Sequence, residues 1–338
     1  MAPESDSTAI PDPSRGTAVV VGGMHRSGTS LLASLFEGAG VAMGDRLLGH
    51  GNGNEAGHFE DLDFQEFHER VLVGNGLTAE GFTSDATPVV PNVLLEEASH
   101  LIESRTRRGG LWGWKDPRTI LFLDFWNDLL PDAKHVFVFR SPWEVIDSFF
   151  RRGDPAFVYN PPHAVRVWLH YNRLILKFVS RHPERCLVRE TTQLIGDPRE
   201  VFATLRERLD VAVADPPDRF RRELLHSNRS GVHARLVAAS CPEAIEVYRA
   251  LQGIAGSTAP LPDDVGVEIA DLAVMQWARA SRLEQDNAAV REEWVKVQSA
   301  LMGLRASVRD LACRTDVDRG LAQQLSDMVG ESSALRAA

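Results

Sequence analysis

The sequence contains few cysteines, no long apolar run and no excess of positive charge. Its three cysteines, Cys186, Cys241 and Cys313, are odd in number and far apart, which argues against a disulfide framework or a zinc site and suits a reducing compartment. No apolar run reaches the ~18 residues of a membrane span. The net charge of -10 gives no support to nucleic-acid binding. An anionic ligand would therefore need a local cluster of cations.

The first 16 residues, MAPESDSTAIPDPSRG, are polar and contain prolines. With neither a basic start nor an apolar segment, they predict a disordered lead-in rather than a signal peptide, and we expect a cytoplasmic protein. A chain of 338 residues, 43% of them hydrophobic, can form a sizeable core in one large domain or two. The organisation that we expect is a main domain over residues 17–235 and a helical extension over residues 236–338.

The stretch Thr17–Gly40, TAVVVGGMHRSGTSLLASLFEGAG, predicts a buried strand, a glycine-bounded loop and a helix. This geometry directs backbone N–H groups and a helix N-terminus at a phosphate. The loop fits G-x-x-x-x-G, but Thr29 stands where a nucleotide triphosphatase has lysine, and a cation comes earlier, at Arg26. We interpret it as a site for a phosphate-bearing ligand other than a Mg-bound triphosphate. A plain strand-to-helix turn is the alternative.

A second strand is predicted at Val41 and Met43, followed by the loop GHGNGNEAGHFED. Open α/β sheets bind ligands at the carboxyl ends of their strands. Glu60, Glu55 and His58 of this loop are therefore candidates for a general base. Asp61 and Asp63 are expected only to favour the N-terminus of the helix that follows.

Two further strands end in cations. The strand 111–115 ends at Lys115, either as a ligand-side group or as a structural ion pair with Asp116 or another neighbour. The strand 135–140 ends at Arg140, and the next helix opens SPWE, which predicts a capping box. Ser148 lies two turns into that helix, so it and Arg140 can converge on a second phosphate.

Strands and helices alternate along residues 17–235, with longer helices over 93–107, 119–130, 163–181 and 201–209. This order predicts an α/β fold with a doubly wound parallel sheet. The C-terminal part changes character, because apolar residues recur every seven positions and form an a/d seam. The positions are Leu283, Val290, Val297, Leu304 and Leu311, with Trp294, Leu301 and Val308 between them. A coiled coil between two chains is our first interpretation, and an intramolecular hairpin is the alternative.

The motifs GMHRSGTSLL, GWKDPRT and VFVFRSPWEVIDSFF resemble those of sulfotransferases that use 3'-phosphoadenosine 5'-phosphosulfate, most closely the bacterial branch akin to carbohydrate and tyrosylprotein enzymes. The resemblance covers residues 17–235 and implies a P-loop-type fold. It implies donor contacts from a set of residues in these motifs and one later arginine. They are Arg26, Ser27, Gly28, Thr29 and Ser30 at the 5'-phosphosulfate, and Arg140, Ser148 and Arg229 at the 3'-phosphate.

The resemblance also implies a glutamate that takes the acceptor proton, and Glu60 fits slightly better than Glu55. It implies transition-state stabilisation by Lys115, with Arg26 neutralising developing charge. We expect in-line transfer to a hydroxyl of a sugar, glycosylated or small-molecule acceptor, without a metal and without nucleic acid or a membrane span. A homodimer through the C-terminal helices is the expected assembly. The rival hypotheses are a kinase that uses ATP and Mg²⁺ and a non-catalytic nucleotide-binding scaffold.

Overall fold

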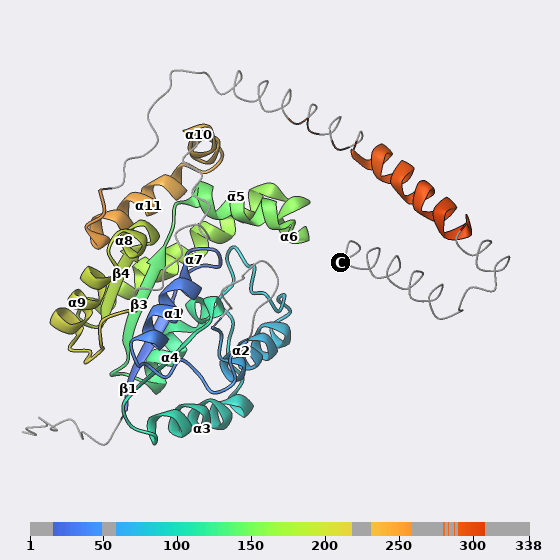
Figure 1. Cartoon of the computed structure of the whole chain (residues 1–338). Coiled ribbons are helices and arrows are strands. Elements are labelled where there is room, and N and C mark those ends of the chain that lie inside the picture. Colours follow the sequence, from blue (N-terminus) through green and yellow to red (C-terminus); the bar gives the residue numbers. More distant parts are fainter. Residues whose placement is uncertain are drawn as a thin grey trace, which may run out of the picture. The chain divides into compact units, whose positions relative to one another are not determined.

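The computed structural model describes residues 16–48, 59–217 and 231–258, together with residues 280, 283, 287 and 290–307 (Figure 1). The chain divides into two compact units, Met1–Val265 and Gly266–Ala338.

The described part of the first unit contains a four-stranded sheet with the order β2-β1-β3-β4. The strands are β1 (Thr17–Gly22), β2 (Leu111–Lys115), β3 (Lys134–Phe139) and β4 (Cys186–Glu190), and all pairs are parallel. The strand predicted at Val41 and Met43 is reduced to one parallel bridge, between Ala42 and Trp112 at the outer edge of β2. The predicted α/β fold with a parallel sheet is confirmed.

Helices cover both faces of this sheet. They are α1 (Thr29–Gly38), α2 (Leu62–Gly74), α3 (Leu95–Thr106), α4 (Leu123–Leu129), α5 (Pro142–Arg152), α6 (Pro155–Val158), α7 (Pro161–Arg181), α8 (Thr191–Gly196), α9 (Pro198–Leu209), α10 (Gly231–Ser240) and α11 (Pro242–Ala255), with the 3-10 helices η1 (Asn92–Leu94), η2 (Pro117–Phe122) and η3 (Pro183–Arg185). The single helix predicted over 119–130 is in fact η2 followed by α4, because Pro117 and the cap at Asp116 set a tight 3-10 start.

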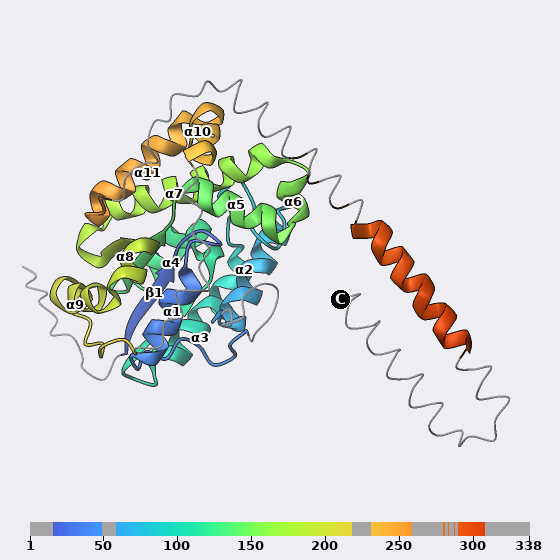
Figure 2. The ribbon, with the colours of Figure 1, turned by 45° about the horizontal axis from the view of Figure 1, so that its top comes forward.

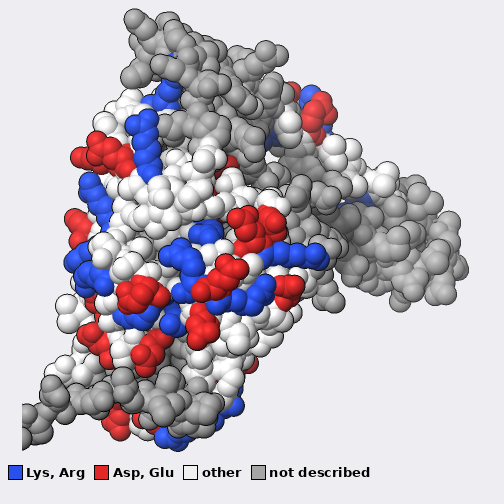
Figure 3. All heavy atoms as spheres, turned by 90° about the vertical axis from the view of Figure 1, so that its left-hand side faces the viewer, with Lys and Arg blue, Asp and Glu red and all other residues white. Residues whose placement is uncertain are grey.

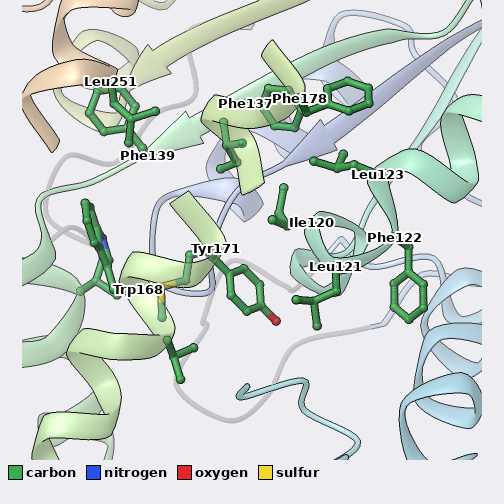
Figure 4. Packing of buried hydrophobic residues seen from close by; sticks show 14 of the residues in the cluster. Ile120, Leu121, Phe122, Leu123, Phe137, Phe139, Trp168, Tyr171, Phe178 and Leu251 are labelled. Carbon is green, nitrogen blue, oxygen red and sulfur yellow. The ribbon is translucent and has the colours of Figure 1, made fainter. Parts of the chain in front are cut away.

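Alternate residues of each strand belong to two separate cores, as the period of a strand requires. Val20 and Phe137 pack with α2, α4, α7 and α11 in the larger core. Val19 and Val136 pack with α1, α8 and α9 in the smaller core. Figure 4 shows part of the larger core, where Tyr171 of α7 lies among the apolar side chains of η2 and β3. The sheet is therefore doubly wound, as predicted.

The first unit extends beyond the predicted boundary at residue 235. That boundary falls inside α10, and α10 and α11 lie beside α5 and α7 in Figures 1 and 2. Tyr248 of α11 is buried, and its hydroxyl donates to Glu190 Oε1 at the end of β4, at 2.5 Å. The boundary prediction was therefore wrong, because the apolar face of α11 completes the core of the sheet unit.

In the second unit, residues 290–307 form a helix, as predicted. Its seam residues Val290, Val297 and Leu304 are exposed. Val308 and Leu311 lie outside the described residues, and the predicted pairing of this helix stays a prediction. Within the described residues, no helix has the length and apolar character needed to cross a membrane.

Figure 3 shows one face of the molecule, on the left-hand side of Figure 1. The lysines and arginines coloured on that face are interspersed with aspartates and glutamates. Mixed charge of this kind keeps a surface soluble but does not attract an anion from a distance. The described residues of this face therefore give no concentrated positive charge of the kind that an anionic ligand needs.

Candidate active site

The loop between β1 and α1 is tightly folded. Arg26 has φ 67° and Gly28 has φ 89°, so the chain passes twice through the left-handed region. A Cβ added at Gly23 would lie 2.3 Å from the carbonyl oxygen of Val138 on β3, so only glycine fits there. The loop is thus pressed against the end of β3.

Hydrogen bonds from Thr191 hold this loop in place, while the N-terminus of α1 has no side-chain cap. Thr191 Oγ1, at the start of α8, is shared between the carbonyl oxygens of Ser27 at 2.6 Å and Phe139 at 2.9 Å. Gly28 is the N-cap of α1 and makes no side-chain capping bond. The first N–H groups of α1 therefore remain available to an anion. The Ser27 hydroxyl is buried and has no hydrogen-bond partner among the described residues.

Arginines gather on the α5 side of the loop. Arg26 Nε donates to Ser148 Oγ at 2.9 Å, so the predicted loop cation and the predicted serine of the second phosphate site are in direct contact. Burial lowers the pKa of Arg26, and so do the charges of Arg152, Arg140 and Arg151, while Asp154 opposes them. Cations that destabilise one another in this way favour the binding of an anion among them.

Arg140 lies buried at the end of β3, next to the start of α5. Its Nη2 is 3.2 Å from Glu144 Oε1, and Ser141 Oγ donates to Glu144 Oε2 at 2.6 Å. Ser141 is the N-cap and Pro142 the first helical residue, as predicted, but the predicted capping box is wrong. The Glu144 carboxylate turns toward Arg140 and the serine hydroxyl instead of the N-cap backbone.

On the other side of the loop, Glu60 and Lys115 form a buried ion pair. Lys115 Nζ donates to Glu60 Oε1 at 2.7 Å, and the two side chains are 2% and 11% exposed. Lys115 is the register partner of Val21, which lies two residues before Gly23, so this pair is adjacent to the loop. The structure therefore brings two of the predicted catalytic residues together, and the ion pair of Lys115 is with Glu60 rather than with Asp116.

Behind this pair lies a network that the sequence analysis did not identify. Arg118 Nη1 is 3.0 Å from Asp116 Oδ1 and 3.9 Å from Glu60 Oε2. Asp116 Oδ2 is 2.7 Å from His68 Nδ1, and Trp126 Nε1 donates to His68 Nε2 at 2.8 Å. Because an indole N–H only donates, His68 Nε2 carries no proton, and the proton on Nδ1 points at Asp116.

The charge on Asp116 is fixed by this network. Burial alone would raise the pKa of Asp116, but Arg118 and the bond from His68 bring it well below its usual range. Asp116 and Arg118 both lie in the motif GWKDPRT, next to the predicted site residue Lys115. Opposite charges that close to a candidate catalytic residue are the signal in the sequence by which this network could have been predicted.

His25, inside the loop, is a further site residue that the sequence analysis missed. Its ring packs edge-on against Phe82 at 5.1 Å and Tyr171 at 6.0 Å between centroids. Its Nδ1 atom is buried and has no hydrogen-bond partner among the described residues. The signal in the sequence was only a histidine at a variable position of the G-x-x-x-x-G pattern.

The remaining predicted residues divide into two groups. Glu55, His58 and Arg229 lie outside the described residues, so their predicted roles stay predictions. Asp61 caps α2 by accepting from the Asp63 N–H at 3.0 Å, and Arg105 pairs with Asp61 at 3.0 Å, which confirms the structural role expected for Asp61. Within the described ranges, no group of three or more His, Cys, Asp or Glu side chains is arranged to hold a metal ion.

No family model matches the chain, and no curated protein matches it. Solved structures are similar to it, among them three sulfotransferase structures. The sulfotransferase domain from the curacin biosynthetic pathway is 19% identical, with 77% of this chain and 97% of that chain covered and a TM-score of 0.36. A sulfotransferase from Alicyclobacillus acidocaldarius is 12% identical, with 73% of this chain and 97% of that chain covered and a TM-score of 0.44. The sulfotransferase domain from the Synechococcus PCC 7002 olefin synthase is 20% identical, with 78% of this chain and 96% of that chain covered and a TM-score of 0.36. Similarity at this level does not establish a shared function, which has to come from the site itself.

Proposed function

We propose that this chain is a sulfotransferase. It moves a sulfuryl group from 3'-phosphoadenosine 5'-phosphosulfate to a hydroxyl of a sugar, glycosylated or small-molecule acceptor. The observation that carries the proposal is the buried Glu60–Lys115 pair beside an anion-binding loop in which Thr29 replaces the lysine of triphosphatases. The Glu60 carboxylate thus meets the Lys115 ammonium and the Arg118 guanidinium at the carboxyl end of β1 and β2.

The residues present fit this donor. The buried, unpaired Ser27 hydroxyl and the uncapped start of α1 are suited to the 5'-phosphosulfate, with Gly28, Thr29 and Ser30 supplying N–H groups. Arg140 and Ser148 are suited to the 3'-phosphate. Ser148 Oγ accepts from Arg26, and a hydroxyl that accepts one bond still has its own O–H to donate.

The donor supplies a sulfuryl group on a leaving group that is stable as an anion, so the protein has mainly to position the reactants and stabilise charge. The acceptor oxygen forms a bond to sulfur while the bond from sulfur to the bridging oxygen breaks, and the hydroxyl proton passes to the Glu60 carboxylate. Before the reaction, Lys115 donates to the Glu60 carboxylate. Once Glu60 has taken the proton, its attraction for the ammonium weakens, and Lys115 can stabilise charge on the bridging oxygen. Arg26 neutralises charge at the donor end.

The test is calorimetric titration of the full chain with adenosine 3',5'-bisphosphate, and separately with ATP and Mg²⁺. We expect micromolar binding of the bisphosphate and little response to ATP. A preference for ATP with Mg²⁺ would favour the kinase hypothesis, and no binding of either nucleotide would contradict the proposal. Binding without any release of sulfate from the donor, even to water, would favour the non-catalytic scaffold.

Arg140→Ala tests the 3'-phosphate contact. A hydrogen bond to a charged group contributes about 1.5–3 kcal/mol, so the dissociation constant of the bisphosphate should rise by roughly 10- to 100-fold. The control is Arg107→Ala, since Arg107 lies outside the site, pairs with Glu103 at 2.7 Å and is exposed. Equal affinities of the Arg140→Ala variant and the wild type would remove Arg140 from the site.

We also propose that the C-terminal helices join two copies of the chain. Support comes from the heptad spacing of Val290, Val297 and Leu304 together with their exposure on the described helix. Apolar residues at this spacing bury one another when two helices supercoil.

A further inference from the structure

His25 is a titratable side chain inside the anion-binding loop for which the reaction described above has no role. It follows Met24 directly, and its ring lies between the loop, Phe82 from the segment after α2, and Tyr171 on α7. Phe82 is itself held in place, because its carbonyl oxygen is 3.1 Å from His163 Nε2. The position of the imidazole is therefore fixed from three elements.

The two nitrogens of this ring are in different surroundings. Nδ1 is buried without a partner among the described residues, whereas the residue as a whole is only half-buried and Nε2 is not buried. A buried N–H without an acceptor is rarer in proteins than an unpaired acceptor. The proton of the neutral ring therefore belongs on Nε2, which leaves a lone pair on Nδ1.

The ring also stays neutral. Burial holds the pKa of His25 well below its usual range, the charges of Arg118, Lys115 and Arg152 lower it further, and Asp116 opposes them. Protonation would moreover place a second N–H on the buried Nδ1, where it has no acceptor. His25 is thus unsuited to take up a proton near pH 7, and it can present one N–H donor to the site.

Direct contacts also locate His25. It precedes Arg26, which donates to Ser148, and its ring packs on Phe82. The segment of Phe82 is held in turn by Arg118, whose Nε donates to the carbonyl oxygen of Ala79 at 2.7 Å and whose Nη1 is 3.9 Å from Glu60. The ring therefore lies beside the loop that would hold the phosphosulfate and against a segment that Arg118 connects to Glu60. This is where the group in transit has to be oriented for in-line attack.

We propose that His25 is a catalytic residue whose neutral imidazole donates its Nε2–H to an oxygen of the sulfuryl group being transferred. The inference rests on the proposed function. It assigns His25 a hydrogen-bonding role and leaves the proton transfer to Glu60.

The test uses the release of sulfate from the donor with water as acceptor, since this reaction needs no knowledge of the natural acceptor. A water oxygen bonds to sulfur, the bridging bond breaks, and sulfate and the bisphosphate are formed. His25→Phe should lower the turnover number about 100-fold, the usual size for one preorganised donor. Its dissociation constant for the bisphosphate, which has no sulfuryl group, should stay within about twofold of the wild type.

Two amide variants decide which nitrogen acts. The Gln amide N–H reaches the position of Nε2, and the Asn amide N–H that of Nδ1. His25→Gln should therefore recover most of the turnover, and His25→Asn should not. His163→Gln is the matched control, because it loosens the Phe82 segment without removing a group from the loop, and its turnover should be near that of the wild type. Nitrogen NMR of the full chain should show His25 neutral and protonated at Nε2 from pH 6 to 8.

Several results would overturn the inference. Near-native turnover of His25→Phe would show that the ring touches no reacting group. A parallel loss of turnover and bisphosphate affinity would place the contact on the nucleotide, and recovery by Asn but not Gln would place it at Nδ1. An imidazolium at pH 7 would exclude the neutral donor. Failure of the wild type to bind the bisphosphate would instead contradict the proposed function, and the NMR result would still stand by itself.

Discussion

Replacing Glu60 with Gln tests both the chemistry and the energetics of the site. The change keeps an oxygen that can accept from Lys115 Nζ, now 2.7 Å away, but removes the negative charge and the proton acceptor. If Glu60 is the general base, the turnover number for sulfate release should fall by about 10²–10⁴-fold. Affinity for the bisphosphate should change little, because Glu60 lies on the acceptor side of the loop.

The same substitution should destabilise the protein. Removing one partner of a buried ion pair costs about 3–5 kcal/mol, and the retained amide oxygen favours the lower end, about 3 kcal/mol. Adding Lys115→Met should restore part of this stability, on the order of 1–2 kcal/mol, because the second change removes a buried charge that has lost its carboxylate partner Glu60. Urea denaturation of the wild type, the two single variants and the double variant gives the coupling free energy directly.

Glu69→Gln is the matched control for both measurements. Glu69 pairs with the same Arg118 at 2.9 Å but is more exposed than Glu60 and does not contact Lys115. Its turnover should remain near that of the wild type. If the Glu60→Gln variant also retained near-native turnover, Glu60 would not be the base, and Glu55 and His58 would be tested next.

Two further predictions concern stability and assembly. Burial lowers the pKa of His135 on β3 to about 3, so the folded state holds this ring neutral while the unfolded chain protonates it near pH 6.5. This contribution to stability is complete above pH 6.5 and is lost as the pH falls toward 3. Between pH 7.5 and 5 the wild type should lose about 2 kcal/mol more than His135→Leu in urea denaturation. An equal loss of unfolding free energy in the wild type and in His135→Leu would refute this. His100→Gln, a change at an exposed histidine, is the control and should behave like the wild type. Leu304→Glu should convert a dimer to a monomer in sedimentation velocity, whereas the off-seam Met302→Glu should not. A wild type that is already monomeric would contradict the pairing.

The sequence alone determined the order of the elements and the place of the loop. The apolar strand Thr17–Val21, the glycines at 23 and 28 and the helical spacing after Thr29 are local signals, and the structure follows them. Because parallel strands end at one edge of a sheet, the positions of Lys115 and Arg140 at strand ends also predicted that they would lie on the ligand side.

Only the tertiary structure decided which charges meet. Lys115 pairs with Glu60 across 55 positions, and Arg26 contacts Ser148 across 122. No local pattern specifies such pairs, because they depend on the register between strands and on how α2 and α5 pack. The same holds for α11, whose apolar face gave no sign that Tyr248 would reach Glu190. His25 shows the limit most plainly, since its tautomer follows from the burial of a single nitrogen, which packing sets and sequence does not.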